Sequence, residues 1–148
     1  MTRKEARERA FILIFEHEFR KSETLEEIIE SAEGYFGDEV GEFTYSLADT
    51  AINHEEELDG LIDKYSANWK KNRISKVNLA ALRLALGEIF YFDETPDSVA
   101  INEAVEIVKK YGGDEEKAFV NGILGGIVKS ERGTVLSEGT AEEENREE

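Results

Sequence analysis

Three cations near the start of the chain have the spacing of a phosphate-binding helix face. Arg7 follows Arg3 by four residues and Lys4 by three, so on a helix the three side chains can line one strip. Glu5 and Glu8 are interleaved with them. Cationic side chains in a row bind successive phosphates and position a nucleic acid without distinguishing its bases. The pattern predicts that this end of the chain contacts a phosphate backbone.

A second group of cations precedes a long apolar segment in the middle of the chain. Its members are Lys70, Lys71, Arg73 and Lys76. The charge pattern leaves two interpretations open: these side chains join the same nucleic-acid surface, or they belong to a solvated connection.

The charges of the chain are strongly segregated. The net charge is −16, yet residues 22–63 hold fourteen acidic and no basic residues, whereas residues 64–87 hold six basic and no acidic ones. The sum argues against indiscriminate binding to nucleic-acid duplexes, whose proteins usually carry a basic surface. It does not exclude one local basic surface, because exposed charges more than about 10 Å apart are screened at ordinary salt.

The residues that commonly carry catalysis or bind metals form no motif in this chain. There is no cysteine, and the histidines are His17 and His54. Each is followed by a glutamate, as in metalloproteases, but Lys21 and Leu58 stand where the second histidine of that motif falls. The glycine pairs precede no Lys-Ser/Thr sequence of a phosphate loop. We therefore expect a protein that is not an enzyme and has no cofactor.

Apolar residues recur at helical spacing along most of the chain and predict an all-α protein. Thr24 with Glu27 predicts a capping box, and Ser75 predicts the start of a helix that is apolar all round and hence central. Gly34 and Gly37 are expected to interrupt the second helix. The expected helices are residues 3–20, 24–34, a region 40–65 with a break near Asn53 and His54, 75–91, 98–111 and 114–132.

The chain divides by composition into a body and a tail. Residues 1–132 form the expected helical domain, a compact bundle of about seven helices. Residues 133–148 are polar and acidic, which predicts a disordered tail. Neither a signal peptide nor an apolar run of membrane-spanning length is evident, so no membrane association is expected.

Several segments together resemble the NusB family. The most specific are VAINEAVEIVKKYG at residues 99–112 and FVNGIL at residues 119–124. Supporting segments are LAALRLALGEIFY at residues 79–91, DGLIDKY at residues 59–65 and the arginine-rich opening at residues 3–10. The resemblance covers nearly the whole chain except its acidic tail.

The resemblance implies two packed three-helix subdomains plus an extra helix. It also implies a cytoplasmic transcription antitermination factor that acts on the elongation complex. Such a factor binds the single-stranded boxA element of ribosomal RNA leader transcripts together with NusE, a ribosomal protein of the small subunit.

The resemblance and the residue chemistry together nominate two sets of contact residues. Phe119 offers a stacking plane for a base, with a core role as the alternative, and the amide of Asn121 can bind base edges. The candidate RNA-binding residues are Arg3, Lys4, Arg7, Lys71, Arg73, Phe119 and Asn121. The resemblance implies that Phe15 and Asn78 face NusE, although Phe15 lacks the hydroxyl of the family's usual tyrosine and Asn78 is uncharged.

Two other interpretations remain open at the level of sequence. The net charge and the interleaved glutamates also fit a helical protein-interaction module with little RNA affinity. The same fold also occurs as the RNA-binding domain before a ribosomal RNA cytosine methyltransferase, but a free-standing factor is favoured because the chain has no room for that catalytic domain.

Overall fold

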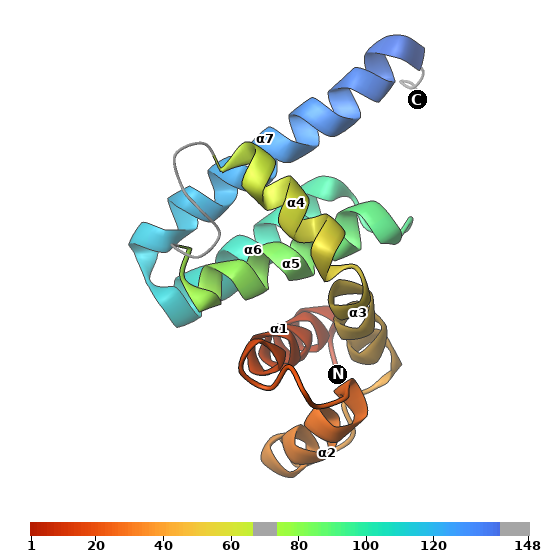
Figure 1. The fold of residues 1–148 in the computed structure, drawn as a ribbon, viewed down its shortest axis with the longest axis vertical. Helices are drawn as coiled ribbons and strands as arrows, with labels where there is room; N and C mark the ends of the chain where they lie inside the picture. Colours follow the sequence, from red (N-terminus) through yellow and green to blue (C-terminus); the bar gives the residue numbers. More distant parts are fainter. Residues whose placement is uncertain (67–73, 140–148) are drawn as a thin grey trace.

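The protein is an α-helical bundle, seen here in a computed structural model that describes residues 1–66 and 74–139, the last seven as backbone alone (Figure 1). The described residues contain seven helices and no strand, which confirms the all-α prediction. The helices are α1 (Arg3–Phe19), α2 (Leu25–Phe36), α3 (Glu42–Asn53), α4 (Glu55–Tyr65), α5 (Lys76–Tyr91), α6 (Asp97–Gly112) and α7 (Asp114–Gly139).

The helices form two groups that meet along α5. In the first group α1 packs against α2 and α3, and in the second α5 and α7 pack on α6. The remaining helix, α4, follows α3 directly and contacts α5 and α7. Because α1 and α3 also pack on α5, the two groups share one hydrophobic core.

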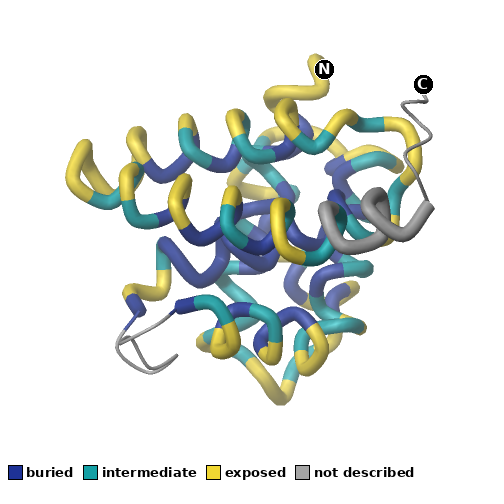
Figure 2. Tube along the Cα trace, turned by 90° about the horizontal axis from the view of Figure 1, so that it is seen from above, coloured by how far each residue is buried: buried dark blue, intermediate teal, exposed yellow. Residues whose placement is uncertain are grey.

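Helix α5 lies at the centre of that core. Every residue from Asn78 to Ile89 is buried, as the apolar cylinder of the sequence predicts. Figure 2 shows buried positions gathered along the middle of the molecule and exposed positions facing outward. A charged side chain on α5 must therefore find its partner inside the protein.

Local signals fix most of the helix ends. The hydroxyl of Thr24 accepts a hydrogen bond from the Glu27 amide, and the Glu27 carboxylate accepts one from the Thr24 amide, so the predicted capping box is present. The Ser75 hydroxyl caps α5 as predicted. Gly113, with φ of 98°, follows the end of α6, and its positive φ suits glycine.

Two boundaries differ from the sequence prediction. Helix α2 runs through Gly34 and ends at Gly37, whose φ is 88°, so the expected interruption at Gly34 was wrong. The backbone of α7 is helical to Gly139, past Gly133, where the acidic tail was expected to begin. The division of the chain into a domain and a tail stays a prediction.

Candidate nucleic-acid and partner interfaces

The first turn of α1 presents two exposed cations. A capping box fixes its start: the Thr2 amide donates to the Glu5 carboxylate over 2.9 Å, and the Glu5 amide donates to the Thr2 hydroxyl over 3.0 Å. Arg3 and Lys4 follow directly and are exposed. Both side chains are therefore accessible to a ligand, and the capping box fixes the geometry of the helix end that carries them.

The two cations turn toward different neighbours. The Arg3 guanidinium lies 3.8 Å from the centre of the Phe43 ring on α3, a cation–π contact. The Lys4 ammonium lies 3.9 Å from the carboxylate of Glu103 on α6, and its side chain is 64% exposed. Both pairs are at the surface, so an incoming phosphate can compete for the cations.

Arg7, the third cation of the predicted strip, points into the protein. It is 7% exposed, and its guanidinium donates to both carboxylate oxygens of Glu88 on α5. Arg7 has the predicted helical spacing from Arg3 and Lys4. It lies one turn further along α1, and there its side chain faces α5. This geometry does not fit a direct phosphate contact.

Helix α6 adds a cation that the sequence analysis did not select. The Lys110 ammonium lies 2.7 Å from the Glu8 carboxylate on α1, and the Tyr111 hydroxyl donates to the same carboxylate. Burial raises the pKa of Glu8, but hydrogen bonds from Lys110 and Tyr111 outweigh it, so the pKa is lowered. The paired lysines in the KKY part of the signature were the available signal.

The remaining predicted RNA contacts are distributed unevenly. Asn121 is exposed near the start of α7, whereas Phe119 is half-buried and packs against the core. Helix α6 packs against both α1 and α7, so it lies between these residues and the first turn of α1. Lys71 and Arg73, like Lys70, lie outside the described residues.

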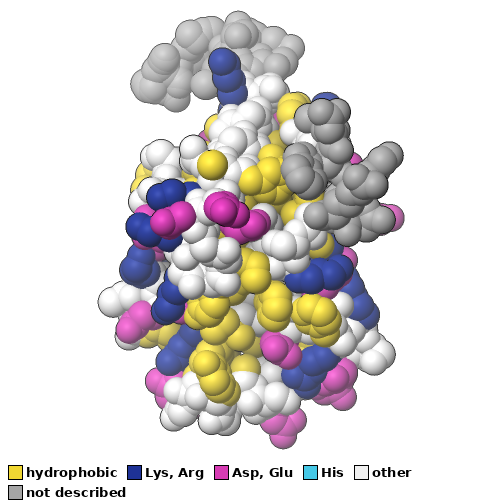
Figure 3. Space-filling model, turned by 90° about the vertical axis from the view of Figure 1, so that its left-hand side faces the viewer, with side chains coloured by type: hydrophobic (Ala, Val, Ile, Leu, Met, Phe, Trp, Pro, Cys, Tyr) yellow, Lys and Arg dark blue, Asp and Glu magenta, His cyan; other side chains and the backbone are white. Residues whose placement is uncertain are grey.

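An aromatic ladder forms the expected partner face of α1. The Phe15 ring lies between Phe11 and Phe19, with ring centres 6.1 and 5.2 Å away. Phe19 is 61% exposed and Phe15 is half-buried. Figure 3 shows hydrophobic side chains gathered in its lower half, at the end of the molecule that α1 and α2 form. Beside the ladder, Ile12, Tyr35 and Tyr111 help to line a hollow of about 360 Å³.

Asn78, the other expected partner contact, lies beneath the surface. It is 3% exposed, and its side-chain amide donates to the Glu116 carboxylate at the start of α7. It thus ties α5 to α7 rather than facing outward. Among the described residues its side-chain oxygen has no hydrogen-bond partner.

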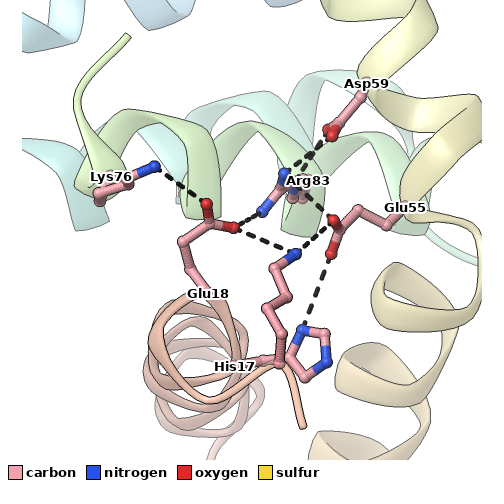
Figure 4. Close-up of polar contacts among 7 residues, drawn as sticks. His17, Glu18, Glu55, Asp59, Lys76 and Arg83 are labelled. Carbon is pink, nitrogen blue, oxygen red and sulfur yellow. Dashed lines mark hydrogen bonds and ion pairs between the residues drawn. The ribbon is translucent and has the colours of Figure 1, made fainter. Parts of the chain in front are cut away.

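A second buried arginine joins three helices (Figure 4). The Arg83 guanidinium on α5 donates two hydrogen bonds to Asp59 on α4, at 2.9 and 2.8 Å, and one to Glu18 on α1, at 2.7 Å. Glu55 lies 3.5 Å away, and Lys76 pairs with the other oxygen of Glu18. Burial raises the pKa of Glu18, but hydrogen bonds from Arg83 and Lys76 lower it to about 2.

The described part of the chain holds no group of acidic and histidine side chains suited to a metal ion. His17, beside the Arg83 network, faces Glu55 at 3.7 Å, and its pKa is lowered chiefly by burial. None of the described helices is both long and apolar enough to cross a membrane.

The model of the NusB family matches residues 4–129, which include all of α1 except its first residue, α5 and the signature of α6 and α7. The chain belongs to the NusB family. The resemblance found in the sequence is thereby confirmed.

Individual NusB proteins are similar in sequence to this chain over nearly their full length. The transcription antitermination protein NusB of Acetivibrio thermocellus is 44% identical over 130 residues, 87% of this chain and 90% of that protein. The protein of the same name from Agathobacter rectalis is 45% identical over 127 residues, 84% of this chain and 97% of that one.

Solved NusB structures share the fold. T. maritima NusB is 33% identical, with a TM-score of 0.75 over 87% of this chain and 92% of that one. A chain from the crystal structure of the antitermination factors NusB and NusE in complex with dsRNA is 29% identical, with a TM-score of 0.77 over 86% of this chain and 96% of that chain.

Proposed function

We propose that this NusB-family protein is a non-catalytic transcription antitermination factor. In this role it binds the boxA element of ribosomal RNA leader transcripts together with NusE, in the cytoplasm and as part of the elongation complex. The observation that carries the proposal is the likeness, over nearly the whole chain, to antitermination proteins, including one solved with NusE and RNA.

The RNA-binding part of the proposal rests on the exposed cations at the first turn of α1. Arg3 and Lys4 supply phosphate contacts, and Lys110 on α6 extends the positive surface along α1. Asn121 supplies a base-edge contact, and the half-buried Phe119 supplies a ring on which a base can stack. Lys71 and Arg73 stay predicted contacts of the same RNA, and Arg7 is omitted because it is buried.

The partner-binding part rests on the aromatic ladder of α1. Phe15 and Phe19 offer apolar surface to NusE, because a half-buried ring next to an exposed one gains contact area when a partner covers both. Asn78 lies one layer below and acts by holding Glu116 rather than by direct contact.

A titration of RNA tests the proposal. A boxA-containing single-stranded RNA and a scrambled RNA are titrated at several salt concentrations, with and without NusE. We expect preference for boxA, tighter binding with NusE, and a log–log salt slope of about −0.7 per phosphate contacted. The Arg3→Ala and Lys4→Ala variants should each make that slope shallower by about 0.7.

A matched control separates a local basic surface from a general effect of charge. Lys64→Ala removes an equally exposed cation on α4 and should leave the slope unchanged. Equal binding of both RNAs contradicts the proposal. Binding of NusE without any RNA binding would instead favour the protein-interaction module.

A further inference from the structure

Arg7 makes a bidentate contact with one buried carboxylate, as Arg83 does with Asp59. Its Nε lies 2.9 and 3.1 Å from the two carboxylate oxygens of Glu88, and its Nη2 lies 2.8 Å from Oε2. Glu88 is 1% exposed and accepts a further hydrogen bond of 2.7 Å from the Thr95 hydroxyl in the connection between α5 and α6. Such a bidentate pair fixes direction as well as distance.

The residues around Arg7 hold the same turn of α1 from the other side. The Thr44 hydroxyl on α3 donates to the Ala6 carbonyl over 2.9 Å, and this contact is buried. The Phe43 ring lies against Arg3 and, edge-on, against Phe92, with ring centres 6.2 Å apart. The first two turns of α1 therefore have anchors on α3 and on α5.

The helical geometry links the inward Arg7 to the outward cations. Arg3 and Lys4 precede Arg7 by four and three residues, so they lie one turn away on either side of its direction. Rotation of α1 by one residue, about 100°, would carry one of the two cations to the angular position of the other and turn that other toward the opposite side of the helix. The direction of Arg7 thus determines where both cations point.

We propose that Arg7, Glu88 and Thr95 form a positioning triad that orients the first turn of α1, so that Arg3 and Lys4 meet successive phosphates. The triad acts on RNA binding without touching RNA. This inference rests on the proposed RNA-binding function, and it assigns to Arg7 a role different from the phosphate contact expected from its sequence spacing.

Two mild variants test the triad. Arg7→Lys keeps the positive charge but cannot form the bidentate contact, and Thr95→Val removes one hydrogen bond of Glu88 while changing no charge. Affinity for boxA RNA is measured with NusE present, at a temperature at which circular dichroism finds every variant folded. We expect a three- to tenfold loss for Arg7→Lys and a two- to threefold loss for Thr95→Val, each with the salt slope of the unsubstituted protein.

Two reference variants are needed to interpret these affinities and slopes. Arg3→Ala should reduce the slope by about 0.7, because it removes a phosphate contact. Arg9→Lys, on the same helix and paired with Asp38, should leave both affinity and slope unchanged. If folded Arg7→Lys and Thr95→Val bind RNA as tightly as the unsubstituted protein, the triad only stabilises the fold and the inference fails.

A second result would also overturn the inference. If Arg7→Gln reduces the slope as much as Arg3→Ala while Thr95→Val has no effect, Arg7 contacts phosphate directly. Amide hydrogen exchange without RNA provides an independent measurement: Arg7→Lys and Thr95→Val should accelerate exchange in the first turns of α1, and Arg9→Lys should not. Absence of RNA binding by the unsubstituted protein contradicts the proposed function, whereas unchanged exchange contradicts the triad.

Discussion

In this member of the NusB family, buried charges are paired between α1 and α5 in a reciprocal way. Near its start α1 supplies Arg7 to Glu88 of α5, and near its end it supplies Glu18 to Arg83 of α5. A buried charge requires a partner, because its desolvation is not repaid otherwise. Since α1 carries both the exposed cations and the aromatic ladder, these two pairs set the place of both proposed surfaces.

The Arg83 pair gives a prediction about stability. Arg83→Met should lower the free energy of unfolding by about 3–5 kcal/mol, because it leaves Asp59 and Glu18 without their buried cation. Arg20→Met removes a guanidinium that pairs with Glu23 at the surface, and should lower the free energy of unfolding far less than Arg83→Met does. Urea unfolding followed by circular dichroism measures both, and similar losses would contradict the assigned roles.

Glu18 gives a prediction about acid. Its folded pKa of about 2 lies below the ordinary value of 4.5, so its ionised form stabilises the fold above pH 4.5. That contribution is lost as the pH falls from 4.5 toward 2. Glu18→Gln should destabilise the protein by about 2 kcal/mol at pH 6, and its deficit should shrink steadily toward pH 2.

The matched control for this pH dependence is Glu30→Gln, on the exposed side of α2. Its free energy of unfolding should follow that of the unsubstituted protein across the same range. A deficit of Glu18→Gln that stays constant from pH 6 to pH 2 would show that the ionisation of Glu18 is not coupled to folding.

At the scale of helices, the helix starts could be predicted from the sequence, whereas the direction in which a side chain on the helix points could not. Thr24 and Ser75 marked helix starts correctly because a cap needs only its own next three residues. Spacing alone placed Arg7 on the strip of Arg3 and Lys4, but only the neighbouring α5 decides that Arg7 points inward. An isolated charge in an apolar helix, such as Glu88, was the signal that could have revealed this pairing.

Helix α2 continues through Gly34, which was expected to interrupt it, and this gives a third prediction. Gly34 is helical and exposed, and a Cβ there would meet nothing within 4 Å. Gly34→Ala should therefore raise the free energy of unfolding by about 0.5–1 kcal/mol. Gly37→Ala should lower it by about 1 kcal/mol, because φ is 88° there. Thermal unfolding measures both, and a destabilising Gly34→Ala would mean that α2 ends earlier.

At the scale of the whole molecule, the segregated charges follow the bundle. The fourteen acidic residues of the segment 22–63 lie on α2, α3 and α4 and their connections, whereas Arg3, Lys4 and Lys110 are exposed on α1 and α6. An RNA at the proposed surface is thus attracted locally by a protein whose net charge repels it. Which contribution dominates depends on the screening length of the solution, about 8 Å at physiological salt and about 30 Å at 0.01 M.

This competition predicts an unusual salt dependence. Between about 0.3 and 0.1 M salt, affinity for boxA RNA should rise as salt falls, because phosphate contacts release counterions. Below about 0.03 M, repulsion by the acidic residues extends across the small protein, and the rise in affinity should flatten.

A variant with fewer exposed acids on α2 and α4 tests this explanation. The combined changes Glu30→Gln, Glu56→Gln and Asp63→Asn should restore the rise in affinity at low salt and leave the affinity at 0.15 M unchanged. The association rate should respond most, because long-range charge acts on diffusional encounter. A slope that stays constant down to 0.01 M in both proteins would mean that the bound RNA experiences the local cations alone.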